Sequence, residues 1–383
     1  MTIPELRFKA DDGSEFPDWE GKKLGDNVKF INGRAYSQDE LLSVGKYQVL
    51  RVGNLFTNDT YYYSDMELEP DKYIEDGDLI YAWSATFGPR IYIGNKCIYH
   101  YHIWKLKFDE NIVSKTFLNY ILERDVEKIM SQRTGGTMVH ITKSAMENRE
   151  LFFPSLPEQK KIASFLSTID DIITTTEAEL TAWQERKKGV MQKIFNREVR
   201  FKADDGSEFP EWEEKRLGEV CEYGKRHGTG QNYVGTENMF SAFGGVIIEN
   251  TESECNGILY SSGDILMSNI RPYLKKAWLA DREGVCSTDV LVFRPIKIES
   301  EYLYCLIASD FFITKVMSAA KGSKMPRGDK KHIMEIPVSV PSLPEQRKIA
   351  DCLSSLDDVI NQIKAELSAW KEFKKGLLQQ MFV

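Results

Sequence analysis

The sequence predicts a mixed α/β fold in which two α/β domains are joined by long α-helices that form an antiparallel coiled coil, with a pseudo-twofold internal repeat. Three observations predict this. Two sequence blocks each occur twice, a heptad pattern of apolar residues follows one of them, and each divergent insert places strand-like segments before a helix-like one. A chain of 383 residues is long enough for two or three domains.

The internal repeat sets the expected domain boundaries. The string RFKADDGSEFP begins at Arg7 and recurs unchanged at Arg200, and PSLPEQ begins at Pro154 and again at Pro341. A constant frame with divergent inserts indicates related tasks on two different targets, because drift after duplication would blur frame and inserts alike. We expect a first domain at 1–153, a central helix at 154–197, a second domain at 198–340 and a C-terminal helix at 341–383.

The long helices are predicted from the residues that follow PSLPEQ, where apolar or long side chains recur at alternating spacings of four and three. Capping boxes, Ser155 with Glu158 and Ser342 with Glu345, are expected to start the two helices. A helix over 158–195 would be about 57 Å long. The continuous seams favour pairing of the two helices with each other over packing of each helix on its own domain. The predicted seam, interrupted at Thr176, Lys187 and Lys374, consists of Ile162, Leu166, Ile169, Ile173, Leu180, Trp183, Val190, Ile194, Ile349, Leu353, Leu356, Ile360, Ile363, Leu367, Trp370, Leu377 and Met381.

Each insert is expected to contain strands followed by a helix. Gly77-Asp78-Leu79-Ile80 matches Gly263-Asp264-Ile265-Leu266, the one stretch that stays alike between the two inserts. The expected strands of the first insert are 46–52, 79–83, 90–93 and 97–108, with a helix at 115–131. Those of the second insert are 246–248, 258–260, 264–268, 276–280 and 289–294, with a helix near 300–319.

Composition and motifs argue against several classes of function. The net charge is −8, no apolar run is long enough to span a membrane, and we expect neither a signal peptide nor disulfides. No phosphate-binding loop, nucleophile elbow, zinc-protease motif or NPPY-like methyltransferase tetrapeptide occurs, so we expect no catalytic residues. His100 and His102 would share one strand face, but no third ligand is evident and we expect no metal site.

Positive charge is nevertheless concentrated in predicted loops, most of all at 315–332, where six basic residues face the single acid Asp329. Loop lysines and arginines bind phosphates, arginine reads guanine edges, and asparagine reads adenine. Matching loops in both inserts favour DNA binding over a merely solvated surface. The candidate DNA-binding residues are Ser84, Thr86, Arg90, Arg133, Thr134, Thr137, His140 and Lys143 in the first insert, and Lys225, Arg226, His227, Asn269, Arg271, Lys275, Lys276, Lys321, Lys324, Arg327, Lys330 and Lys331 in the second.

The repeated segments PSLPEQKKIASFLSTIDDII and PSLPEQRKIADCLSSLDDVI resemble the helical regions of specificity subunits of type I restriction-modification systems. The openings FPDWEGKKLGD and FPEWEEKRLGE also fit this family, and the resemblance covers essentially the whole chain. It implies that each insert is a target-recognition domain that reads one half of a split double-stranded DNA sequence. The helices would then fix the gap between the two halves.

The resemblance also implies partners and a location. Two modification subunits would dock on the helices and methylate adenine with S-adenosylmethionine, and restriction subunits that use ATP and Mg²⁺ can join them. The chain itself would be a non-catalytic cytoplasmic subunit without a cofactor of its own. Three alternatives stay open: the specificity subunit of a type II enzyme that cuts on both sides of its site, a coiled-coil scaffold with two domains that bind other ligands, and a self-contained enzyme.

Overall fold

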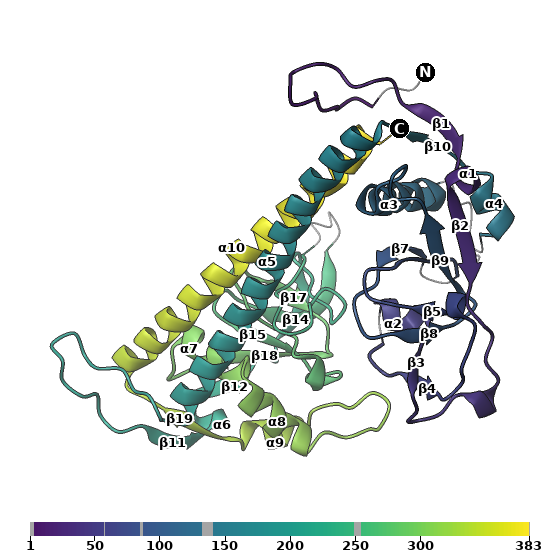
Figure 1. Ribbon diagram of the computed structural model, residues 1–383. Coiled ribbons are helices and arrows are strands. Elements are labelled where there is room, and N and C mark those ends of the chain that lie inside the picture. Colours follow the sequence, from purple (N-terminus) through teal and green to yellow (C-terminus); the bar gives the residue numbers. More distant parts are fainter. Residues whose placement is uncertain (1–3, 57, 85–86, 132–140, 249–253, 383) are drawn as a thin grey trace. The chain divides into compact units, whose positions relative to one another are not determined.

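The computed structural model describes residues 4–56, 58–84, 87–131, 141–248 and 254–382. The chain divides into two compact units, one of residues 1–177 with 366–383 and the other of residues 178–365. Each unit therefore contains one α/β domain together with one half of each long helix. The elements are labelled in Figure 1.

The first unit contains two four-stranded sheets. One sheet is antiparallel and has the order β2-β9-β6-β7, whereas the other has the order β4-β3-β8-β5 and contains the parallel pair β3–β8. The predicted helix at 115–131 is confirmed as α3. The elements are β1 (Glu20–Lys23), α1 (Leu24–Asn27), β2 (Val28–Asn32), η1 (Gln38–Glu40), β3 (Tyr47–Leu50), α2 (Val52–Phe56), β4 (Tyr62–Ser64), η2 (Pro70–Lys72), β5 (Tyr73–Ile74), β6 (Leu79–Ala82), β7 (Gly88–Ile91), β8 (Cys97–Tyr99), β9 (Ile103–Phe108), α3 (Lys115–Ser131), α4 (Lys143–Glu147) and β10 (Glu150–Phe153).

The second unit repeats the first sheet in the order β12-β18-β15-β16 and adds a three-stranded sheet, β13-β14-β17. In both units the strand directly before PSLPEQ pairs with the first strand of the unit. These pairs are β10 with β1 and β19 with β11. The elements are β11 (Glu213–Arg216), α6 (Leu217–Val220), β12 (Cys221–Tyr223), β13 (His227–Gly230), β14 (Cys255–Tyr260), β15 (Ile265–Ser268), η3 (Pro272–Leu274), β16 (Ala277–Leu279), β17 (Gly284–Cys286), β18 (Val290–Pro295), α7 (Ser300–Ile307), α8 (Asp310–Ser318), α9 (Lys330–Met334) and β19 (Pro337–Val340).

The matching Gly-Asp stretches form the same turn in both units. The glycine has a positive φ, 81° in one unit and 87° in the other, which a residue without Cβ adopts at little cost. Asp78 and Asp264 each accept a backbone N–H from three residues earlier, at 2.7 and 2.9 Å. Each also pairs with a cation on the neighbouring strand, Asp78 with Lys105 and Asp264 with Arg294. The retained motif thus fixes the start of β6 and β15.

Three predicted elements are wrong in detail. The strand expected at 97–108 is broken by a turn at 100–102, so His100 and His102 do not lie on one strand. The helix expected near 300–319 is two helices, because the Ser309 hydroxyl accepts the Phe312 N–H and caps a new one. The strand expected at 246–248 is only an isolated bridge at Val246.

The predicted capping boxes are also wrong. Glu158 and Glu345 are fully buried, and each forms a two-point ion pair with an arginine of the repeated RFKADDGSEFP block. Arg7 donates to Glu158 at 3.0 and 2.9 Å, and Arg200 donates to Glu345 at 3.2 and 3.0 Å. The hydroxyls of the two cap serines have no hydrogen-bond partner among the described residues. The carboxylates therefore bind a distant segment instead of their own helix start.

The rest of the repeated block makes matching contacts in the two units. Lys161 binds Asp11 at 2.7 Å in the first unit, and Lys348 binds Asp204 at 2.5 Å in the second. Each lysine also donates to the backbone carbonyl two positions before that aspartate, Lys9 or Lys202, at 2.7 and 2.8 Å. The identical sequence thus makes the same contacts at the start of each long helix. We call these contacts the clasp: Arg7 with Glu158 and Asp11 with Lys161 in the first unit, and Arg200 with Glu345 and Asp204 with Lys348 in the second.

The long helices are α5 (Leu156–Phe195) and α10 (Leu343–Met381), and they pair antiparallel (Figure 1). Within the first unit Lys374 lies 2.9 Å from Asp170, and within the second Lys187 lies 2.5 Å from Asp357. The seam lysines thus form cross-helix ion pairs. The buried predicted seam residues are Ile162, Leu166, Ile169, Ile173, Ile194, Ile349, Leu353, Ile360, Ile363, Leu377 and Met381, and the partly buried ones are Leu180, Trp183, Val190, Leu356, Leu367 and Trp370.

Lys374 differs from Lys187 in having a second acidic neighbour. It also binds Glu123 of α3 at 3.1 Å, and its Nζ lies 5.2 Å from the ring centre of Tyr120, whose hydroxyl donates to Asp170 at 2.7 Å. Burial raises the pKa of Glu123, and Lys374 opposes that rise. The charge of Lys374 therefore offsets the repulsion between the neighbouring carboxylates of Glu123 and Asp170.

Replacing Lys374 by methionine is expected to lower the free energy of unfolding by about 1–2 kcal/mol at pH 7, because half-exposed carboxylates are partly screened by water. Loss of the lysine raises the pKa of Glu123 further. A carboxyl whose pKa is raised by folding destabilises the fold only when ionised, so the loss should fade as the pH falls toward the ordinary value of 4.5. Denaturant unfolding from pH 4 to 8 measures this. Lys187 pairs with a single carboxylate, that of Asp357, among the described residues, so Lys187→Met should show a weaker pH dependence.

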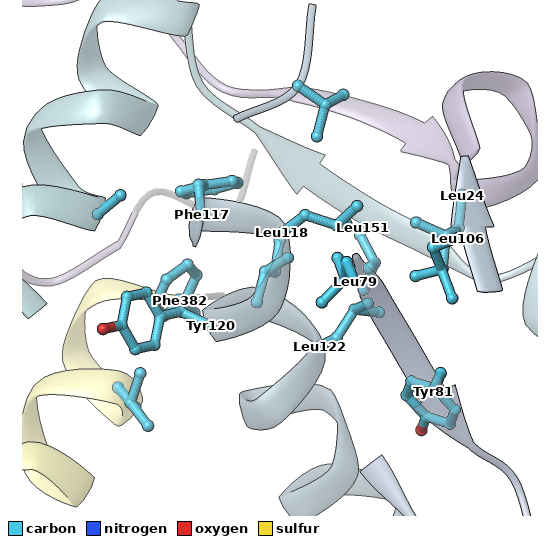
Figure 2. Packing of buried hydrophobic residues seen from close by; sticks show 14 of the residues in the cluster. Leu24, Leu79, Tyr81, Leu106, Phe117, Leu118, Tyr120, Leu122, Leu151 and Phe382 are labelled. Carbon is cyan, nitrogen blue, oxygen red and sulfur yellow. The ribbon is translucent and has the colours of Figure 1, made fainter. Parts of the chain in front are cut away.

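The core of the first unit joins the sheet, α3 and both long helices. Figure 2 shows Phe117, Leu118 and Leu122 of α3 beside Leu79 of the sheet and Phe382 of the chain's C-terminal segment. Among the described residues, no helix combines the length and the apolar character needed to cross a membrane.

Candidate nucleic-acid interface

Two loops of the second unit come together and carry most of its predicted DNA-binding residues. The Arg271 N–H donates to the Pro326 carbonyl at 2.7 Å, and Ile270 forms a β-bridge with Arg327. Arg327 forms a second bridge with Lys321. We call this set the basic loop cluster: Arg271, Lys275, Lys321, Lys324, Arg327, Lys330 and Lys331.

The β15–β16 connection within the cluster has an unusual backbone. Arg271 and Lys275 have φ values of 49° and 55°, in the left-handed region, on either side of the short helix η3. Residues held in this region cost of order 1 kcal/mol each and are frequent at functional sites. Asn269 is buried, and neither its Oδ1 nor Arg271 Nε has a hydrogen-bond partner among the described residues.

Carboxylates hold part of the cluster in place. Arg327 lies 3.1 Å from Asp289, Lys321 lies 2.7 Å from Asp329, and Lys275 lies 2.6 Å from Asp310. The hydrogen bond from Lys321 lowers the pKa of Asp329 to about 2, so this aspartate stays ionised at neutral pH. Lys324, Lys330 and Lys331 are exposed. The cluster thus combines cations that carboxylates orient with lysines that are exposed.

The remaining predicted residues of the second unit lie apart or point inward. Lys276 is half-buried and donates to the Thr236 carbonyl at 2.8 Å. Lys225, Arg226 and His227 are exposed at the start of β13, in the other sheet of the unit.

The structure gathers few of the predicted residues of the first unit. Ser84 is buried, Arg90 is exposed with its guanidinium 4.8 Å from the ring centre of Phe56, and Lys143 lies 3.6 Å from Glu147 on α4. The other predicted residues, Thr86, Arg133, Thr134, Thr137 and His140, lie outside the described residues.

A different set of residues occupies the equivalent loops of the first unit. The Trp83 N–H donates to the His102 carbonyl at 3.0 Å, just as the Asn269 N–H donates to the Asp289 carbonyl at 2.8 Å. The β6–β7 loop and the β8–β9 turn therefore match the β15–β16 loop and the β17–β18 turn. We call Trp83, His100, Tyr101 and His102 the aromatic loop pair. Sequence reasoning missed it, although extending the Gly-Asp alignment places Trp83 opposite Asn269.

The aromatic loop pair is packed and carries little charge. The Trp83 Nε1–H donates to the Tyr101 carbonyl at 2.9 Å, and its ring stacks on Trp104 at 5.7 Å with an interplanar angle of 20°. Burial lowers the pKa of His100 to about 4, and His102 and Arg51 add to the effect. His100 is therefore neutral at physiological pH.

The described part of the chain offers little else for chemistry. It contains no group of three His, Cys, Asp or Glu side chains placed to hold a metal ion. Burial raises the pKa of the Cys221 and Cys286 thiols to about 12 and that of Cys97 to about 11, so these thiols are protonated and poor nucleophiles.

Comparison with known proteins agrees with this arrangement. The family model "Type I restriction modification DNA specificity domain" matches residues 17–182 and 210–369. The chain is 26% identical to the type I restriction enzyme MjaVIII specificity subunit of Methanocaldococcus jannaschii, over 98% of this chain and 94% of that one. It is 25% identical to the EcoDI specificity subunit of Escherichia coli, over 71% and 70% of the two chains.

A solved structure shares the fold. The S subunit of a type I restriction-modification system from M. genitalium aligns with a TM-score of 0.61 at 19% identity, and the alignment covers 100% of this chain and 99% of that one. The two family matches fall one on each α/β domain and its following helix. The chain therefore belongs to the type I restriction-modification specificity subunits, with one DNA specificity domain for each half of a bipartite target.

Proposed function

We propose that this chain is the non-catalytic, cytoplasmic subunit that supplies sequence specificity to a DNA methyltransferase complex. One observation carries the proposal: the two units share the strand order of one four-stranded sheet, the clasp and the loop hydrogen bonds, yet the matched loops carry different side chains. A common scaffold that presents different loop side chains is suited to reading two different half-sites.

In this proposal the basic loop cluster contacts the second half-site. Arginines such as Arg327 donate two hydrogen bonds to the edge of a guanine. Lysines contact phosphates and fix the register of the protein on the duplex. Covalent linkage of two readers raises the effective concentration of the second contact, so two weak half-sites suffice for tight binding. The helix pair sets the distance between them.

The partners supply the chemistry in this proposal. Two modification subunits dock on the helical frame, one for each half of the pseudo-twofold repeat, bind S-adenosylmethionine and methylate adenine. Restriction subunits that require ATP and Mg²⁺ join the same complex. The clasp that repeats at Glu158 and Glu345 supports the stoichiometry, since it gives each half the same frame surface.

The test is a selection from random duplex DNA with the tagged chain, purified together with the modification subunits from its own host. We expect two short conserved blocks separated by a fixed gap. Exchange of residues 219–340 for the insert of a relative should change one block and leave the other intact. A pool that stays random while the complex is intact and folded would refute the proposal.

Charge removal in the basic loop cluster should weaken binding and flatten its salt dependence. Replacing Lys324, Lys330 and Lys331 by glutamine is expected to reduce the slope of log K against log salt by about 0.9 for each lysine that contacts a phosphate. Fluorescence anisotropy on the selected target at several salt concentrations measures the slope. Glutamine at Lys29, Lys107 and Lys297, exposed lysines outside the cluster, serves as the control. Equal slopes for the two triple variants would show that Lys324, Lys330 and Lys331 do not contact DNA phosphates.

A further inference from the structure

The aromatic loop pair differs in exposure from the aromatic residues on the strands beside it. Trp104 and Tyr99, at the adjoining strand ends, are 1% and 0% exposed and belong to the core. Tyr101 is 39% exposed, and Trp83, His100 and His102 are partly exposed. Side chains that only filled the core would be covered like their neighbours, so these rings form part of a surface.

That surface is held rigidly by its own ring contacts. The ring centres of Tyr101 and His102 lie 3.9 Å apart, and those of His100 and His102 lie 4.9 Å apart. The Trp83 ring meets that of His102 edge-on, with 5.0 Å between the ring centres. The Trp83 ring is fixed further by stacking on Trp104 and by its bond to the Tyr101 carbonyl. Such a surface is preorganised, so binding orders few side chains.

Among the residues that the structure describes, this surface has little charge to offer a phosphate. His100 is neutral because of its burial, and the nearby Arg34 is bound to Glu40 at 2.6 Å. Arg51, whose charge reaches His100, lies over the Tyr62 ring at 5.2 Å. In the second unit the same loop positions hold Asn269 and Asp289, next to Arg327. The matched loops thus present apolar rings in one unit and polar or charged groups in the other.

We propose that the aromatic loop pair reads the first half-site through apolar contact with thymine methyl groups in the major groove, whereas the basic loop cluster reads the second half-site by hydrogen bonding. This inference rests on the proposed function, because it assumes that the matched loops face DNA in both units. The thymine C5-methyl is the one apolar group on the major-groove edge of the base pairs, and it is bound by apolar side chains.

The geometry favours contact with methyl groups over insertion of a ring between base pairs. A side chain that unstacks DNA must project as a free wedge. The Trp83 ring has one face against Trp104 and its N–H bonded within the turn, and Tyr101 packs on His102. A fixed, partly exposed patch of ring edges is complementary to a row of methyl groups.

The experiment replaces thymine by deoxyuridine, which removes only the methyl group, in one half-site of the selected target at a time. The half-sites are assigned by the exchange of residues 219–340, and the complex with modification subunits is used throughout. We expect affinity to fall about fourfold for each contacted methyl in the first half-site. Deoxyuridine in the second half-site should have no effect, whereas 7-deazaguanine there should weaken binding.

The Tyr101→Ser variant completes the test, because thymine and deoxyuridine in the first half-site should then bind alike. Ile112→Ser, at an apolar residue of the same unit that is 50% exposed and lies outside the aromatic loop pair, is the control and should keep the discrimination. Unchanged discrimination at the positions of the first half-site that hold no thymine shows that the first unit of each variant is folded. A first half-site without thymine, or equal binding of deoxyuridine by the parent chain, would overturn this inference. Two conserved blocks from the selection would still leave the proposed function standing.

Discussion

Replacing Arg7 by methionine is expected to lower the free energy of unfolding of the first unit by about 3–5 kcal/mol. The guanidinium is the cation paired with Glu158, whose side chain has no exposed area, and its removal leaves a buried carboxylate with no opposite charge. Among the described residues, Trp19 Nε1–H at 3.3 Å is the other side-chain donor to Glu158, and it cannot replace a two-point ion pair.

Hydrogen exchange resolved along the chain is the appropriate measurement, because two units need not unfold in one step. Arg200→Met should lower the free energy of unfolding of the second unit by a similar amount, because Arg200 makes the equivalent pair with Glu345 there. Combining Arg7→Met with Glu158→Gln should recover much of the stability, since the buried charge is gone. A loss below about 1 kcal/mol for either arginine variant would mean that the clasp contributes no more than a surface ion pair.

Replacing Phe382 by alanine should cost the first unit about 3–5 kcal/mol. The ring is 2% exposed and packs against Phe117 (Figure 2), at 5.5 Å between ring centres. Its centre also lies 6.4 Å from that of Trp19. Its removal leaves a cavity between α3 and the end of α10. Denaturant unfolding of the variant and the parent chain measures the loss.

The internal repeat provides the control for this substitution. Phe195 occupies the equivalent position of the other long helix, but it is only partly buried, and within the described part of the chain its one ring neighbour is Tyr302, at 6.2 Å between ring centres. Phe195→Ala should therefore cost about 1–2 kcal/mol, in line with partial burial. Equal losses at the two positions would show that burial of the ring does not set the cost.

Features that depend on local periodicity could be predicted from the sequence. The heptad seams and α3 follow from the spacing of apolar residues, and β6 and β15 follow from the Gly-Asp turn. The role of Glu158 could not be predicted in this way. Ser-x-x-Glu has the same spacing whether the carboxylate caps its own helix or binds Arg7, which is 151 residues away in sequence. Only the tertiary fold decides between these partners.

The grouping of residues in the candidate site could be predicted to a similar extent. A concentration of basic residues in loops identified the basic loop cluster without any knowledge of its geometry. The aromatic loop pair was missed because Tyr, His and Trp in a β-rich stretch predict a continuous strand, and aromatic residues favour strands. The turn at 100–102 interrupts that strand and brings Tyr101 to the surface. Alignment of the two units by their turns, rather than by residue type, would have identified it.

The division of both helices between the units has a consequence for synthesis of the protein. The second unit is one continuous stretch, residues 178–365, whereas the first unit needs residues 366–383 in addition to 1–177. Because a nascent chain emerges from its N-terminal end, the unit that begins first is completed last. Until Leu377 and Phe382 emerge from the ribosome, the apolar face around Ile162 lacks its partners. During translation, the first half is therefore the part of the chain most exposed to aggregation and most dependent on chaperones.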